Sequence, residues 1–152
     1  MKKYLIFINH QIVHKFWVLV YCFKFSLCLM WRAVSHDMSK FSKREFFSFC
    51  NTVHKLKDST FGTPEYKKLL EGLGPALRYH YDSNRHHPEH FYMAKHRGMN
   101  LIDFVEMYLD WKAAIKKHSD GNLLESVIHN TKRFQMSKDT SCLLINSVDT
   151  KV

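Results

Sequence analysis

The chain has 152 residues, which is enough for one domain with a hydrophobic core. A hydrophobic content of 45%, with 14% aromatic residues, excludes a disordered chain. The formal net charge of +9 favours anionic partners, but the basic residues are scattered and form no run long enough for a nucleic-acid-binding arm.

The first predicted helix runs from about Tyr4 or Asn9 to about Trp31. Its most apolar part, residues 16–31, is short for a membrane span, which needs about 20 residues, and it contains Lys24. Polar and basic residues just upstream also interrupt the pattern of a signal peptide. We therefore expect a buried core helix and no membrane partner. An interfacial or membrane helix and a signal peptide are the alternatives.

The rest of the chain is expected to be helical, because it has no hairpin dipeptide and no sustained alternation of apolar and polar residues. Ser42 and Glu45 fit a capping box, and Thr63-Pro64 fits a helix start. The expected helices cover residues 42–57, 63–81 with a break at 72–75, 88–98, 101–117 after an Asn100 cap, 122–130 and 138–145. We therefore predict one all-α domain of about six to seven helices over residues 4–147, with a frayed tail at 148–152.

The four cysteines form no C-x-x-C pair. This spacing argues against a zinc ribbon and against a thioredoxin-like motif. Cysteines that serve neither purpose are typical of a reducing compartment, so a cytoplasmic protein is expected.

Histidines and acids gather in four clusters along the chain. The clusters are His10 and His14; His36-Asp37; His80, His86, His87 and His90; and Asp103, Glu106 and Asp110. Imidazoles on apolar helices are costly to bury without partners, and crossing helices can bring such groups to one point. A mixed nitrogen and oxygen ligand set suits Mn, Fe, Co, Ni or Zn. The sequence therefore predicts a site for a divalent metal.

The order of these groups resembles the HD superfamily of metal-dependent phosphohydrolases. The likeness is closer to an uncharacterised family of small HD-like proteins of bacteria and phages, and it spans about residues 10–135. The similar segments are VHKFWVLVYCFK, HDMSKFSKREFF, YHYDSNRHHPEHF and EMYLDWKAA, in which H-D-x-S-K-F and N-x-H-H-x-E are the most specific pieces. The resemblance implies an HD-like helical domain with the metal ligands His14, His36, Asp37 and Asp110. Pairing into a homodimer is a further expectation from such relatives.

Several other residues are candidates for the same site. The resemblance makes His80 and the N-x-H-H-x-E piece second-metal ligands, phosphate contacts or acid–base groups. Glu106 is predicted as a ligand or as the carboxylate that orients a ligating histidine. His86 and His87 precede a helix start, where free N–H groups can hold phosphate. With Arg85 and Lys40, they are expected to stabilise phosphoryl charge or to protonate a leaving oxygen. Surface charge is the alternative for the two basic residues.

A divalent ion lowers the pKa of water and polarises a phosphoryl oxygen. We therefore predict hydrolysis of a phosphate ester or anhydride on a small, nucleotide-like substrate. The alternatives are a non-catalytic module that binds metal or nucleotide, a nucleic-acid-processing protein suggested by the net charge, and a membrane-associated protein anchored by residues 4–31.

Overall fold

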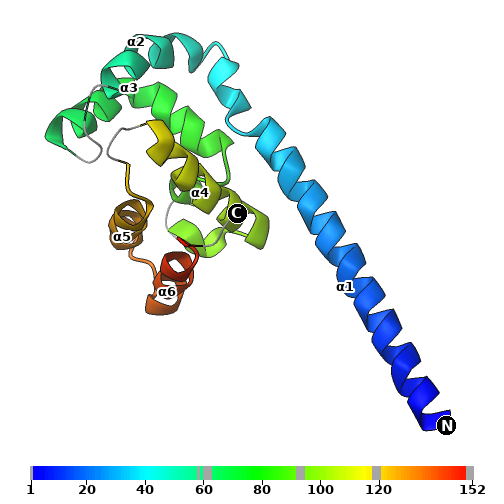
Figure 1. The fold of residues 1–152 in the computed structure, drawn as a ribbon. Helices are drawn as coiled ribbons and strands as arrows, with labels where there is room; N and C mark the ends of the chain where they lie inside the picture. Colours follow the sequence, from blue (N-terminus) through cyan, green and yellow to red (C-terminus); the bar gives the residue numbers. More distant parts are fainter. Residues whose placement is uncertain (1, 58, 60–62, 92–94, 118–120, 150–152) are drawn as a thin grey trace. The chain divides into compact units, whose positions relative to one another are not determined.

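The computed structural model describes residues 2–57, 59, 63–91, 95–117 and 121–149, and all regular structure within them is helical (Figure 1). The predicted all-α class is therefore confirmed. The chain divides into two compact units, Met1–Ser35 and His36–Val152, and the boundary between them falls inside the span predicted as one domain. Of the tail predicted at 148–152, residues 150–152 lie outside the described part, whereas Val148 and Asp149 belong to the turn after the last helix.

The first unit is a single unbroken helix, α1 (Lys2–Ser35), drawn blue to cyan in Figure 1. No residue of α1 is buried, and Leu19 and Trp31 are 67% and 71% exposed. The prediction of a buried core helix is therefore wrong. The physical reason is that apolar composition predicts removal from water without specifying what covers the surface.

The described elements of the second unit follow in this order: η1 (Met38–Phe41), α2 (Phe46–Lys57), α3 (Pro64–Ser83), η2 (Pro88–Phe91), η3 (Lys95–Gly98), α4 (Leu101–Ala114), η4 (Ile115–Lys117), α5 (Leu123–Arg133) and α6 (Lys138–Asn146). Helices α2 and α3 pack against each other, and α5 packs against both α4 and α6 (Figure 1). The short helix predicted over 88–98 is two 3-10 turns, between which residues 92–94 lie outside the described part.

Local sequence signals set several helix ends. The Thr63 hydroxyl accepts a hydrogen bond from the Tyr66 N–H at 3.2 Å, and Pro64 occupies the first turn of α3, as predicted. The predicted break in this helix is a kink, because Gly74 adopts a φ of 43° before Pro75. Glycine reaches this left-handed region without the steric penalty of a side chain.

The predicted capping box at Ser42 and Glu45 is wrong. Helix α2 begins at Phe46, and the Glu45 carboxylate is fully buried, with Oε2 at 2.9 Å from Nδ1 of His80. A buried carboxylate gains more from a buried imidazole than from an exposed backbone N–H. Tertiary contact therefore overrides the local signal and draws Glu45 towards the histidines.

A hydrophobic core joins α4, α5 and α6. Met107, Val127 and Leu144 are at most 2% exposed, and the rings of Trp111 and Phe134 stack with centroids 6.3 Å apart. One side of α4 packs into this core. The acids of α4 at positions 103, 106 and 110 recur every three or four residues, so they share a different side of the same helix.

Candidate functional site

Three of the four predicted clusters meet within the second unit. Two triads place their potential ligand atoms within 4.8 Å of one another: His36, His86 and Asp110 in the first, and Asp37, His80 and His87 in the second. They come from the segment before η1, from the end of α3, from the loop before η2 and from α4. Both triads combine imidazole nitrogen with carboxylate oxygen, the ligand set predicted for a divalent metal.

Asp37 lies between the two triads. Its Oδ1 is 3.4 Å from Nε2 of His80 and 3.5 Å from Nε2 of His86. Its Oδ2 is 3.5 Å from Nε2 of His36. The backbone of Asp37 has a φ of 55°, a left-handed conformation that aspartate tolerates better than most residues. This conformation turns the chain into η1 and directs one carboxylate towards histidines of both groups.

Carboxylates also contact the Nδ1 atoms of three of the histidines. Oε1 of Glu106 is 2.9 Å from Nδ1 of His36 and 3.3 Å from Nδ1 of His86, and Glu45 contacts Nδ1 of His80. A carboxylate at Nδ1 favours the tautomer that carries its proton there, which leaves Nε2 with a lone pair. The geometry of Glu106 is thus that of an orienting carboxylate, one of the two roles predicted for it.

Buried polar atoms at the centre of the cluster have no hydrogen-bond partner among the described residues. These include Oδ1 of Asp37 and Nε2 of His86, which face each other across 3.5 Å. Leaving such atoms buried and unsatisfied is expensive. Nε2 of His80 and Nε2 of His87 also approach within 2.9 Å. Cations that accept lone pairs from oxygen and nitrogen, one in each triad, would satisfy the unpaired atoms of Asp37 and His86, so the residues present fit divalent metals.

The charges of the metal-free cluster differ sharply between neighbours. Burial opposes the ionisation of Asp37, but the Lys40 ammonium, which donates to Oδ2 at 2.6 Å, outweighs it and lowers the pKa to about 2. Hydrogen bonds to Asp110 and Glu106 raise the pKa of His36 to about 10 against the effect of burial. At neutral pH the aspartate is therefore ionised and His36 carries a proton that a metal would displace.

His87 lies in the opposite environment. Burial, followed by the charges of His86 and His80, lowers the pKa of His87 to about 3. Its imidazole is therefore neutral at physiological pH. A neutral imidazole has the lone pair that ligation of a metal requires.

The predicted ligand His14 lies in α1, in the other compact unit, with an exposed side chain. Its role as a ligand stays a prediction. In the second unit, His36 and Asp110 have His86 as the third member of their triad. The structure thus places His86 with the ligand candidates, and second-metal ligand is one of the three roles that the resemblance implied for it beside phosphate contact and acid–base group.

The guanidinium of Arg85 binds the carboxylate of Asp103. It donates to Oδ2 of Asp103 from Nη2 at 2.9 Å and from Nε at 3.2 Å, and it lies over the ring of Phe91. Asp103 is fully buried and also accepts from the backbone N–H of Asn100 at the helix start. This forked pair connects α4 to the loop before η2. The predicted catalytic role of Arg85 stays a prediction.

Two residues of the cluster were missed in the sequence. Glu45 was assigned to a helix cap, and Ser39 was given no role. The Asn84 side-chain amide donates to the Ser39 hydroxyl and to the His80 carbonyl, both at 2.7 Å, and Ser39 lies 3.3 Å from Nδ1 of His80. The H-D-x-S-K-F piece contained the signal for Ser39, whereas nothing local distinguishes Glu45 from an ordinary cap residue.

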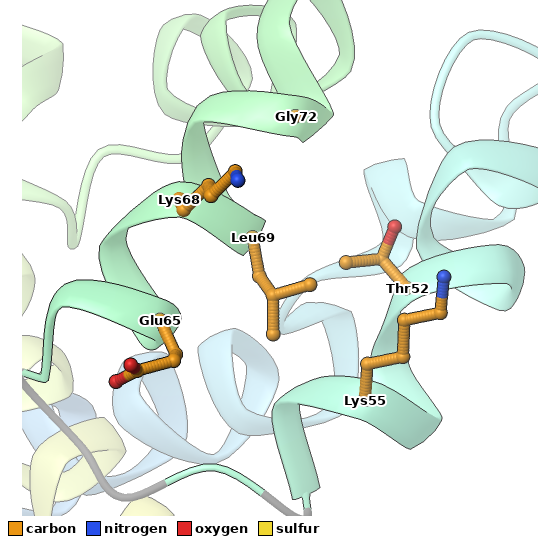
Figure 2. A pocket seen from close by; sticks show the side chains of 6 residues that line it. All are labelled: Thr52, Lys55, Glu65, Lys68, Leu69 and Gly72. Atoms are coloured by element: carbon orange, nitrogen blue, oxygen red, sulfur yellow. The ribbon is translucent and has the colours of Figure 1, made fainter.

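A separate hollow of about 470 Å³ lies between α2 and α3 (Figure 2). Leu69 and Thr52 face its interior, whereas Lys55 and Lys68 extend their ammonium groups at its edges. None of the six triad residues lines it. Surface lysines around an open hollow lack the convergent, buried polar groups of a binding site, so the histidine cluster is the better candidate.

The match to a family model covers residues 6–150, and the chain therefore belongs to a family of unknown function, DUF5662. Comparison with curated proteins gave no match, and comparison with solved structures gave none either.

Proposed function

We propose that the chain is a metal-dependent phosphohydrolase whose two triads hold divalent ions, and that it cleaves a phosphate ester or anhydride on a small, nucleotide-like molecule. The observation that carries this proposal is the convergence of imidazole Nε2 atoms on Asp37, with Oδ1 of Asp37 and Nε2 of His86 buried and without hydrogen-bond partners. A histidine core built only for stability would pair these atoms with donors or acceptors.

The residues that would hold the ions fall into two sets, the ligands themselves and the carboxylates that orient the ligating histidines. The triad residues would supply the ligand atoms, and Asp37 would serve both triads because its two oxygens face different histidines. Glu106 and Glu45 would keep the Nδ1 protons in place and the Nε2 lone pairs available. The position of His86 and His87 in the triads supports a ligand role ahead of the acid–base role predicted from the sequence.

A bound divalent ion supplies Lewis-acid activation of water and of a phosphoryl oxygen. Lys40 is a basic side chain in contact with the cluster, and its Nζ lies over the Phe49 ring, 5.3 Å from the ring centroid. With Asp37 holding a metal, the Lys40 ammonium would be available to bind a phosphoryl oxygen, as a compact point charge suited to phosphate. Partial exposure of Lys40 gives a substrate access to it.

The net charge of +9 supports a phosphate-bearing small molecule as the partner. The four cysteines are free and exposed, which fits a reducing compartment. The free cysteines support a cytoplasmic location for the second unit.

The test is a phosphohydrolase screen of the full chain, supplied in turn with Mn²⁺, Fe²⁺, Co²⁺, Ni²⁺ or Zn²⁺. The substrates are p-nitrophenyl phosphate, its bis ester and nucleoside mono-, di- and triphosphates. The parent is compared with a His36→Ala/Asp37→Ala double variant and with His129→Ala, an exposed histidine of α5. We expect metal-dependent release of phosphate or nitrophenol by the parent and by His129→Ala, and loss of at least a hundredfold in the double variant.

Equal rates in the parent and in the double variant would refute the proposal, because the activity would then come from a contaminant. Metal-dependent nucleotide binding without product would favour the alternative of a sequestering module. Isothermal titration with a slowly hydrolysed nucleotide analogue measures that binding directly.

A further inference from the structure

The exposed surface of α1 is a feature that the proposed chemistry does not explain. Large apolar side chains are exposed along its whole length, from Tyr4 to Val34, and no residue of the helix is buried. Helices of proteins are stabilised chiefly by burying an apolar face. Such a surface therefore requires a covering partner.

The distribution of apolar residues around α1 distinguishes between kinds of partner. Residues 16–21 are six successive apolar residues, and because each residue advances about 100° they reach every side of the helix. A groove, a partner helix or a membrane surface requires only a stripe. A helix that is apolar on every side suits the interior of a large core or of a bilayer, and α1 contributes no residue to a core.

The dimensions of α1 also fit a bilayer. Its 34 residues extend about 51 Å, compared with a hydrocarbon thickness of about 30 Å. The helix is long and apolar enough to cross a membrane. Lys15 and Arg32 bound the most apolar stretch, residues 16–31, whose length of about 24 Å is somewhat less than the hydrocarbon thickness, and Trp17 and Trp31 lie just inside its two ends. Tryptophan and basic residues concentrate in this way at the two membrane–water interfaces.

The charges of α1 indicate which lipid it favours. The helix contains five basic residues and no acidic one: Lys2, Lys3, Lys15, Lys24 and Arg32. Basic residues near a membrane surface are each attracted to anionic lipid by about 1 kcal/mol. Lys24 lies within the stretch and opposes insertion by up to about 3 kcal/mol, which its long side chain reduces by reaching towards the interface.

We propose that α1 inserts into a lipid bilayer that contains anionic lipid and anchors the second unit, whose first residue, His36, directly follows Ser35. The expectation of no membrane partner depended on α1 being a buried core helix. Because α1 has no buried residue, a membrane partner takes its place. The proposal is independent of the phosphohydrolase activity, because none of the six triad residues lies in α1.

The test is flotation of the full chain, tagged at its C-terminus, with vesicles of phosphatidylcholine containing a minority of phosphatidylglycerol. Leu19→Glu/Phe23→Glu places two charges in the apolar stretch, and Leu124→Glu/Leu143→Glu is the matched control at exposed positions of α5 and α6. The parent and the control are expected to float and to resist both high salt and alkaline carbonate. The α1 variant is expected to lose at least tenfold of the floating fraction, since central charges strongly disfavour insertion.

Three results would overturn the membrane proposal. The parent could remain in the soluble fraction beside the vesicles, in which case light scattering would show whether a second copy covers α1. High salt could release it, which would reduce the contact to surface attraction. The intact mass could show that the apolar segment is removed during expression, as in a signal sequence. Circular dichroism of the α1 variant checks that it remains folded.

Discussion

Helices α1 and α4 are both rich in apolar residues, yet they have opposite environments. α1 has no buried residue, whereas α4 buries Asp103, Glu106, Met107, Tyr108 and Trp111. The acids of α4 recur on one side and its core residues occupy another, and both sides contribute buried residues. In α1 the apolar residues reach every side. A helix with two distinct sides can serve a protein core and a site at once, whereas a uniformly apolar helix needs an apolar environment around it.

Shortening one large side chain on each helix should have very different effects on stability. Met107→Ala opens a cavity in the core of the second unit and should lower its free energy of unfolding by about 2–5 kcal/mol. Leu19→Ala should change it by no more than about 0.5 kcal/mol, because Leu19 is exposed. Urea unfolding in mild detergent, followed by Trp111 fluorescence with Trp17 and Trp31 replaced by Phe, measures both. Similar losses in the two variants would mean that α1 shares the core.

Among the acids of α4, Asp103 stabilises the fold through its contact with Arg85. Arg85→Ala leaves the buried Asp103 without its forked partner, and we expect a loss of about 2–3 kcal/mol in stability. This is below the range for a fully buried pair, because the Arg85 side chain is 44% exposed. Metal content should remain at the parental level. A loss of metal with unchanged stability would assign Arg85 to the site instead, as the sequence predicted.

The next acid of α4, Glu106, should affect the metal more than the fold. Glu106→Gln retains the shape of the side chain but weakens the hold on Nδ1 of His36 and His86, and we expect a 10- to 100-fold loss of metal affinity. Competition with a chromogenic chelator measures the affinity. Glu125→Gln, at an exposed position of α5, is the control and should retain full affinity. Unchanged affinity in Glu106→Gln would reduce the contact to a structural hydrogen bond.

Another expected effect is a pH dependence of the metal-free protein. Burial lowers the pKa of His87 from 6.5 to about 3, so its contribution to stability is complete above pH 6.5 and is lost as the pH falls towards 3. The pKa of His36 is raised to about 10, so its contribution is complete below pH 6.5 and is lost as the pH rises to 10. These two residues alone predict greatest stability near pH 6.5.

Unfolding midpoints after chelator treatment, measured across this pH range, check that prediction. His87→Gln should flatten the acidic side, by at most about 1.4 kcal/mol per pH unit. An acidic side of unchanged slope in His87→Gln would show that other groups control it.

Local signals predicted the parts of the fold that depend on neighbours in sequence. Thr63 caps α3, Asn100 caps α4, and the Gly74-Pro75 break exists as a kink. Glu45 fitted a local cap equally well, but a histidine distant in sequence binds it instead. Such competition depends on tertiary packing, and a local pattern contains no information about it.

The candidate site was predictable in its residue types and only partly in its membership. The clusters at 36–37, 80–90 and 103–110 meet, because their imidazoles and carboxylates satisfy one another when buried together. The assignment of His86 beside His36 and Asp110 depends on how the loop before η2 crosses α4, which spacing does not reveal. The burial of α1 was predicted wrongly, since composition specifies an apolar environment and leaves open whether protein or lipid provides it.

The most direct test of the metal centre is elemental analysis of the full chain and of two aspartate variants, after supplementation with each candidate metal. We predict about two ions per parental chain, loss of both in Asp37→Ala because this carboxylate faces both triads, and retention of one in Asp110→Ala. A parental chain that holds no metal would contradict the account, and so would an Asp37→Ala variant that retains both ions.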